Sequence, residues 1–145
     1  MKYSNIKKVK EFCQSLDSQP DWREVIKEID QNSNDFEIDD VRFICDTDIK
    51  DILEDELAAD EYMLGCFTAW AIADATGWPL ALIEAAQKGE QYEAIGEAMT
   101  GEHVANLADC LISNDGYGHH FNRYDGNEEE LMLGKDIHYH VFDNH

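Results

Sequence analysis

Residues 41–77 read VRFICDTDIKDILEDELAADEYMLGCFTAWAIADATG, and this stretch decides the fold because two segments of opposite character meet in it. Its second half, residues 62–75, is apolar on almost every side, which is the pattern of a buried helix. About 14 residues are too few to cross a bilayer. We therefore expect a central core helix at residues 61–76, ended by Gly77 and Pro79.

The first half of the stretch predicts an acidic helix. Eight carboxylates and one cation, Lys50, lie between Asp46 and Glu61. The apolar residues among them recur at the spacing of a single helical stripe, which would hold the helix on a core. They are Ile49, Ile52, Leu53 and Leu57. The remaining faces of this helix would present a dense negative charge.

Net charge is the most unusual property of the whole chain. Its 145 residues include 32 Asp and Glu against 11 Lys and Arg, a formal net charge of −21. The excess is uneven, since residues 1–27 carry +2 and residues 28–145 carry −23. Such a surface repels nucleic acid and anionic membranes and attracts basic partners. The simplest alternative is an ordinary acidic protein, for example one from a high-salt habitat.

Composition is that of a globular protein without a targeting segment. An apolar content of 43% and an aromatic content of 10% argue against wholesale disorder. We expect neither a signal peptide nor a membrane span, because no basic stretch precedes a long apolar run. The four cysteines are widely spaced, which predicts reduced, buried thiols in a cytoplasmic protein.

The remaining periodicities predict helices, followed by strands near the C-terminus. Amphipathic spacing indicates helices at residues 4–16, 20–30, 79–88, 91–99 and 102–112. Residues 36–45 alternate as a short strand does, and the aromatic ending predicts strands at residues 117–124, 128–133 and 137–142.

The predicted fold class is therefore α+β. We expect a mainly helical single domain around a buried central helix, closed by a small C-terminal antiparallel β-sheet that residues 41–45 could join. Residues 1–35 would form a less acidic helical segment and residues 36–145 the acidic α+β core, together one globular unit.

Several motifs carry a resemblance to a protein family. They are RFI at residues 42–44, YMLGCF at 62–67, DGYGHHF at 115–121 and YDGNE at 124–128. Over residues 41–142 the chain resembles a widespread group of small uncharacterised phage and plasmid proteins. The resemblance implies a mobile-element origin and a place in the cytoplasm of a bacterial host, but no particular activity. In charge, though not in motifs, the chain is similar to acidic DNA mimics such as antirestriction proteins, anti-CRISPR proteins and glycosylase inhibitors.

Mimicry of phosphate charge would give the acidic stretch a function. Duplex DNA carries about one charge per 1.7 Å of axis, and helical residues three or four apart have Cβ atoms about 5–6 Å apart. Residues 28–87 hold 16 acids and two cations, and residues 128–130 form a second acidic group. The predicted partner-binding residues are Asp46, Asp48, Asp51, Glu54, Asp55, Glu56, Asp60 and Glu61.

The favoured hypothesis is thus a non-enzymatic inhibitor without a cofactor. It would occupy the nucleic-acid channel of a basic host protein, such as a restriction or CRISPR enzyme, and would bind neither nucleic acid nor membrane itself. Its affinity should fall with salt. The simplest alternative is a solvated charged face. A homodimer is expected only if an apolar patch is exposed.

Four histidines near the C-terminus support a different hypothesis, a divalent metal site for an ion such as Zn²⁺. Two histidines two positions apart on a strand point to the same side, and Asp125 or Glu128 could add an oxygen ligand. The candidate ligands are His119, His120, His138 and His140. The site would be structural or hydrolytic; the simplest alternative is that these side chains face solvent or pack on aromatic rings.

Other chemistry has little support in the sequence. No GxSxG, P-loop or HExxH pattern occurs, so no catalytic residue is predicted. The aromatic residues of the ending would either cover the core or, if exposed, dock a partner of a phage structural or regulatory module. They are Tyr117, Phe121, Tyr124, Tyr139 and Phe142.

Overall fold

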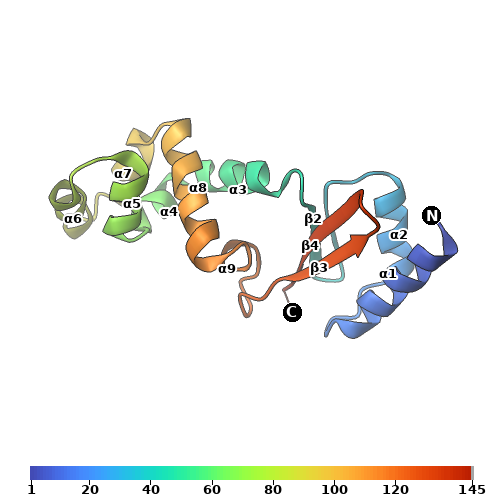
Figure 1. Ribbon diagram of the computed structural model, residues 1–145. Coiled ribbons are helices and arrows are strands. Elements are labelled where there is room, and N and C mark those ends of the chain that lie inside the picture. Colours follow the sequence, from blue (N-terminus) through green and yellow to red (C-terminus); the bar gives the residue numbers. More distant parts are fainter. Residues whose placement is uncertain (145) are drawn as a thin grey trace. The chain divides into compact units, whose positions relative to one another are not determined.

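The computed structural model describes residues 1–144, over which nine helices and four strands follow one another (Figure 1). The predicted class is confirmed: the fold is α+β, mainly helical, with a small antiparallel sheet. Contacts divide the chain into two compact units. Unit 1 comprises residues 1–49 and the chain from 117 onward, and unit 2 comprises residues 50–116. Residues 1–35 lie in unit 1 together with residues 36–49.

Two hairpins form the sheet of unit 1. The first joins β1 (Asp35–Ile38) to β2 (Val41–Cys45), and the second joins β3 (Glu129–Leu133) to β4 (Ile137–Asp143). All neighbours are antiparallel, in the order β1-β2-β4-β3. Both residues of the first turn have positive φ, 50° and 67°, as a tight hairpin turn between twisted strands requires. Residues 41–45 thus join the C-terminal strands, as expected.

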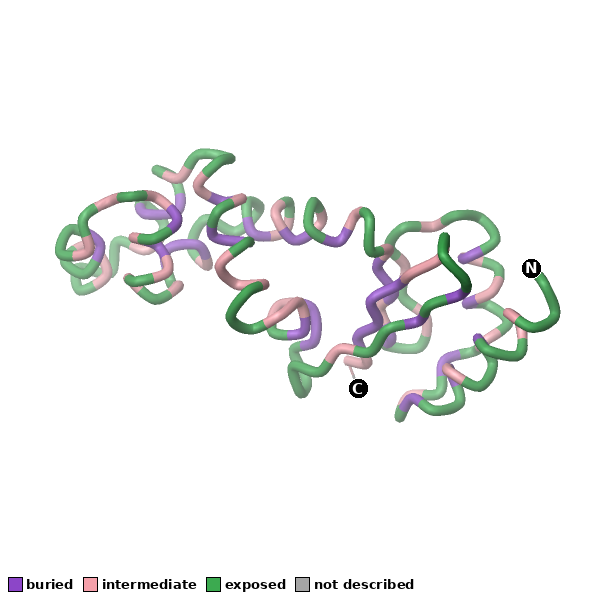
Figure 2. The backbone as a smooth tube through the Cα atoms, in the orientation of Figure 1, coloured by how far each residue is buried: buried purple, intermediate pink, exposed green. Residues whose placement is uncertain are grey.

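Two N-terminal helices cover one face of this sheet. They are α1 (Tyr3–Ser15) and α2 (Trp22–Asp30), each amphipathic as the sequence predicted. Figure 2 shows the buried residues of unit 1 along β2 and β4 and on one side of each helix. The resulting core contains Val9, Cys13, Leu16, Val25, Ile29, Val41, Phe43, Leu131, Leu133, Tyr139 and Val141. Burial raises the pKa of the Cys13 thiol to about 12.

The strand expected at residues 117–124 is wrong. The chain forms α9 (Gly118–Phe121) there, and the Phe121 ring packs 5.2 Å from that of Phe142. A Cβ at Gly118 would lie 2.2 Å from the Gly126 carbonyl oxygen, so only glycine permits this close return of the loop. The aromatic pattern thus reflects packing on the sheet. Of the five aromatic residues proposed as a docking surface, only Tyr124 is exposed.

Unit 2 is helical. Its elements are α3 (Ile49–Ala58), which starts at the last residue of unit 1, and then α4 (Glu61–Cys66), α5 (Ala69–Thr76), α6 (Leu80–Lys88), α7 (Tyr92–Ala98) and α8 (Gly101–Asp115). A buried cluster of Ile72, Ile83 and Ile95 joins α5, α6 and α7. Within residues 1–144, every helix is too short or too polar to reach across a lipid bilayer.

The single buried helix expected at residues 61–76 is also wrong. The chain breaks at residues 67–68, where the Thr68 hydroxyl accepts a hydrogen bond from the Ala71 amide and begins α5. The Gln87 side-chain amide donates a hydrogen bond of 2.7 Å to the Phe67 carbonyl oxygen, which gives this backbone group at the break a partner. Trp70 is 75% exposed, so this segment is not buried on every side. The expectation of buried thiols likewise fails at Cys66, which is exposed.

Candidate functional site

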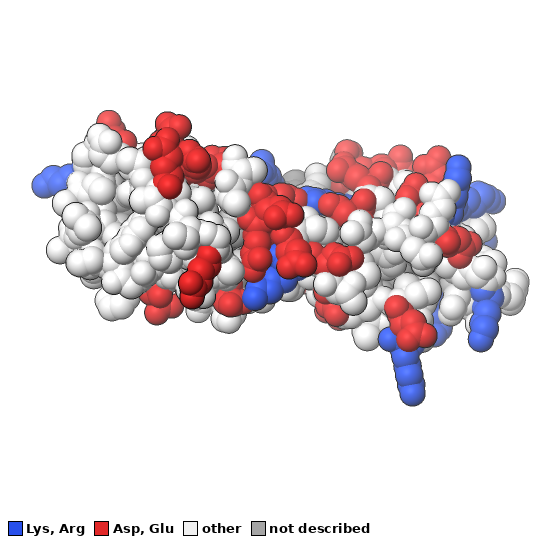
Figure 3. Space-filling view, turned by 90° about the horizontal axis from the view of Figure 1, so that it is seen from above, with Lys and Arg blue, Asp and Glu red and all other residues white. Residues whose placement is uncertain are grey.

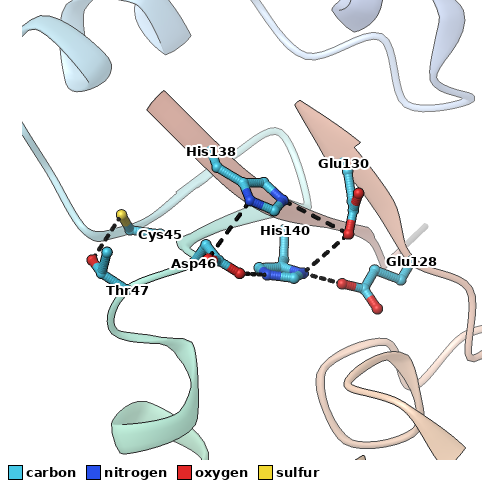
Figure 4. A network of polar contacts seen from close by, with 7 residues as sticks. All are labelled: Cys45, Asp46, Thr47, Glu128, Glu130, His138 and His140. Carbon is cyan, nitrogen blue, oxygen red and sulfur yellow. Dashed lines mark hydrogen bonds and ion pairs between the residues drawn. The ribbon is translucent and has the colours of Figure 1, made fainter. Parts of the chain in front are cut away.

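Strand alternation brings ligand-type side chains to the face of the sheet opposite α1 and α2. In register, His140 of β4 lies between Ile44 of β2 and Glu130 of β3. His138 lies two residues away and so points to the same side. Asp46 follows β2, and its amide donates to the His138 carbonyl oxygen at 2.9 Å, which fixes its place beside the two histidines. Figure 4 shows these side chains converging, together with that of Glu128.

His140 is the centre of this cluster. Its side chain is 7% exposed, and its Nε2 lies 2.6 Å from Asp46 Oδ1. Its Nδ1 faces Glu128 Oε1 in a second close contact. Burial alone would lower the pKa of His140, but hydrogen bonds and charge from the two carboxylates outweigh burial and raise it. The two carboxylates therefore favour the protonated form of His140.

His138 stacks on His140 with ring centroids 4.9 Å apart and an interplanar angle of 27°. Its Nδ1 lies 3.7 Å from Asp46 Oδ2, and its Nε2 lies 3.7 Å from Glu130 Oε1. Both distances exceed that of a hydrogen bond. Within residues 1–144, His138 Nε2 is a buried atom that has no hydrogen-bond partner. The two rings thus each present one nitrogen toward Asp46 and the other toward a glutamate.

The metal ligands expected from the sequence are only partly brought together. His138, His140 and Glu128 meet, and Asp46 and Glu130 join them. His119 and His120 lie on α9, where the His120 ring contacts the Phe121 ring edge-on at 4.8 Å. Neither belongs to a group of potential ligands among the described residues. Asp125 instead accepts hydrogen bonds from Asn122 and Asn127.

The raised pKa of His140 predicts a pH-dependent stability in the presence of a chelator. Because the folded pKa lies above the value of about 6.5 of an unfolded histidine, the folded state binds more protons between the two values. The contribution of His140 to the free energy of unfolding should therefore be complete below about pH 6.5 and be lost as pH rises through the folded pKa, by no more than about 1.4 kcal/mol per pH unit. Urea denaturation in EDTA measures this.

The control for that prediction is a histidine elsewhere on the surface. His140→Gln should lose the decrease of stability above about pH 6.5, whereas the exposed His119→Gln should keep it. Equal slopes in His140→Gln and the wild type would contradict the assignment of this proton to His140.

The predicted partner-binding residues lie in different surroundings. Asp46 is turned toward the histidines of unit 1 and does not belong to the acidic helix. On α3, Asp51 and Asp55 are exposed, whereas Glu54 Oε1 lies 3.8 Å from Lys50 Nζ. Asp48 and Glu56 are half-buried. Asp60 caps α4, because its side chain accepts a hydrogen bond from the Met63 amide at 3.0 Å.

A further acidic group arises from the packing of α4 on α7. The carboxylates of Glu61, Glu93 and Glu97 are exposed and have oxygens within 4.8 Å of one another. Only Glu61 was predicted as a site residue. The other two are 32 and 36 positions away in sequence, so the group becomes apparent only when the pairing of α4 with α7 is known.

Comparisons with protein-family models, with curated proteins and with solved structures found no match for this chain.

Proposed function

We propose that this protein is a non-enzymatic inhibitor from a phage or other mobile element, which binds a basic nucleic-acid-handling protein of a bacterial host through the acidic surface of unit 2. One observation carries the proposal: unit 2 exposes almost all of its carboxylates and has almost no cations of its own. Such a surface offers a basic channel the charge that it normally receives from nucleic acid.

The charge balance of unit 2 is extreme. Residues 50–116 hold 14 Asp and Glu and two lysines, a net charge of −12, and 12 of the acidic residues are exposed. One of the lysines, Lys50, already pairs with Asp109 at 2.7 Å. Figure 3 shows acidic side chains spread over the visible face of the molecule and outnumbering the basic ones. An extended anionic surface of this kind attracts cationic partners and speeds their association.

The close carboxylates of unit 2 support binding of a cation-rich partner. Asp51 and Asp55 are one helical turn apart on α3, and Glu61, Glu93 and Glu97 are grouped across α4 and α7. Like charges at such separations repel one another, which lowers the stability of the free protein. Lys or Arg side chains of a partner would remove this repulsion, so the free energy of binding includes its relief. The resemblance to phage and plasmid proteins is the reason to expect a restriction, CRISPR or similar defence enzyme as the target.

Charge reversal in unit 2 should abolish the interaction. The variant Asp51→Lys, Asp55→Lys, Glu61→Lys, Glu97→Lys replaces four exposed acids and leaves the cap Asp60 intact. Each new lysine faces a basic partner surface, and such like-charge contacts cost several kcal/mol together. We therefore expect the affinity for a basic partner protein isolated from bacterial lysate to fall more than about 100-fold, measured by surface plasmon resonance at fixed salt.

A matched variant separates local charge from net charge. Glu11→Lys, Asp17→Lys, Glu37→Lys, Asp136→Lys changes the same number of exposed acids in unit 1. It should retain most of the affinity, and circular dichroism should show both variants folded. Equal weakening by the two variants, or none by the unit 2 variant, would refute a binding surface on unit 2.

A further inference from the structure

We propose that Asp46, His138 and His140 bind one divalent transition metal ion of the zinc type on the sheet of unit 1. This inference is independent of the acidic surface of unit 2, because every residue involved belongs to unit 1.

The types of ligand select the class of metal. Imidazole nitrogen favours Zn²⁺, Fe²⁺, Co²⁺, Ni²⁺ and Cu²⁺, whereas Mg²⁺ and Ca²⁺ prefer sites made of oxygen alone. Two imidazoles and a carboxylate form a common set for the first group. Three protein ligands leave at least one coordination position for water. The Asp46 side chain is 49% exposed, so this side of the cluster is open to solvent.

The distances between the three ligands suit a shared ion. Donor atoms of all three lie within 4.8 Å of one another, and His138 Nδ1 is 3.7 Å from Asp46 Oδ2. Ligand atoms around a tetrahedral zinc ion at about 2.1 Å are about 3.4 Å apart. The contact of 2.6 Å between His140 Nε2 and Asp46 Oδ1 is shorter, so these two atoms would move apart when an ion binds between them.

The two glutamates occupy the places of orienting groups. Histidine ligands of metals usually donate their second ring N–H to a carboxylate or carbonyl, which fixes the ring and its tautomer. Here His140 Nδ1 faces Glu128, and His138 Nε2 lies 3.7 Å from Glu130 Oε1. In both histidines, therefore, one ring nitrogen faces Asp46 and the other faces a glutamate carboxylate. Packing alone gives no reason for this arrangement to occur twice.

Charge balance also favours a cation. Within residues 1–144, none of the three carboxylates Asp46, Glu128 and Glu130 forms an ion pair with Lys or Arg. A divalent ion bound between Asp46 and the two imidazoles would supply positive charge beside these three carboxylates.

The test is titration of untagged, EDTA-treated full-length protein with Co²⁺ and Zn²⁺. Bound Co²⁺ should give visible absorption bands with a stoichiometry of one per chain, and Zn²⁺ should abolish them by competition. Zn²⁺ should also raise the melting temperature, because an ion that binds only the folded state stabilises it. Mg²⁺ in excess should neither displace Co²⁺ nor raise the melting temperature. If neither Co²⁺ nor Zn²⁺ binds at millimolar concentration, the proposal is overturned.

Matched variants assign the roles of the residues. His138→Ala, at a half-buried position, should weaken Co²⁺ binding by more than about 100-fold, whereas His119→Ala should not change it. Glu130→Gln should weaken binding by about 10- to 100-fold, the usual effect of losing an orienting carboxylate. Its neighbour Glu129 points to the other face of β3, so Glu129→Gln should bind as the wild type does.

Unchanged Co²⁺ affinity in folded His138→Ala would overturn the site. If that variant fails to fold, the comparison of Glu130→Gln with Glu129→Gln decides, and equal affinities in those two would overturn the proposal. Because unit 2 is unaltered in all of them, binding of a basic partner should be unaffected, which keeps this test separate from the test of the proposed function.

Discussion

Replacing Gly65 or Gly96 with alanine is expected to destabilise unit 2 severely. At these two positions α4 and α7 bring their backbones into direct contact. A Cβ at Gly65 would lie 1.8 Å from the Tyr92 carbonyl oxygen, and a Cβ at Gly96 would lie 1.9 Å from that of Glu61. No change of rotamer can relieve a clash with backbone, so the helices must separate. Overpacking usually costs about 1–3 kcal/mol, and these contacts should reach or exceed the upper value.

Urea denaturation followed by circular dichroism would measure this effect, and Gly101→Ala is the matched control. A Cβ at Gly101, the first residue of α8, meets nothing within 4 Å. That variant should be neutral or about 0.4–1 kcal/mol more stable, because alanine restricts the unfolded chain. Equal stabilities of Gly65→Ala, Gly96→Ala and Gly101→Ala would contradict the close pairing of α4 and α7.

Phe43→Ala is expected to cost about 3–5 kcal/mol of unfolding free energy in unit 1. The Phe43 side chain is fully buried on β2, and its ring stacks on that of Phe36 with centroids 4.9 Å apart and planes 7° apart. Removing it leaves a cavity between the sheet and the N-terminal helices. The loss is a large part of the roughly 5–15 kcal/mol that stabilise a typical domain.

Tyr3→Ala provides the aromatic control for this prediction. The Tyr3 side chain is 82% exposed, so its loss should change the free energy of unfolding by less than about 0.5 kcal/mol. The denaturation midpoints of the two variants should therefore differ widely. A Phe43→Ala variant as stable as Tyr3→Ala would show that the sheet does not pack on α1 and α2 as described.

Much of the fold could be predicted from periodicity, because most helices pack through one continuous stripe. The helices at residues 3–15, 22–30, 80–88 and 101–115 lie close to the expected ranges. The strands at 129–133 and 137–143 do as well. In each case one side of the element is apolar and the sequence repeats at the period of that element.

Two predicted elements were wrong because the composition of their residues suggested a helix or a strand that the packing of the chain does not form. Residues 61–76 are mostly apolar, but Thr68 begins a new helix and Gly65 makes a close backbone contact, so the segment forms two helices. Thr68 as an N-cap was a recognisable signal that the apolar run obscured. Residues 117–124 look like a strand, but Gly118 permits a compact return of the loop against Gly126.

The candidate site depended on strand register, which sequence alone did not supply. Two histidines two positions apart were enough to place His138 and His140 on one face. Asp46 was assigned to the acidic helix because it precedes that helix in sequence, yet its pairing with His138 brings it to the sheet. Glu130 was recognised only as part of an acidic run. Its position beside His140 follows from the pairing of β3 with β4.

The most direct test of the account is capture of partners from bacterial lysate at about 0.1 M salt, followed by elution with a salt gradient and identification of the eluted proteins. The wild type and the variant reversed at Asp51, Asp55, Glu61 and Glu97 are compared side by side. We predict that the wild type retains a basic DNA- or RNA-handling enzyme that elutes sharply as salt rises, and that the variant does not retain it. Retention of the same protein by both, or binding that persists at high salt, would contradict the proposal that the acidic surface of unit 2 replaces nucleic acid.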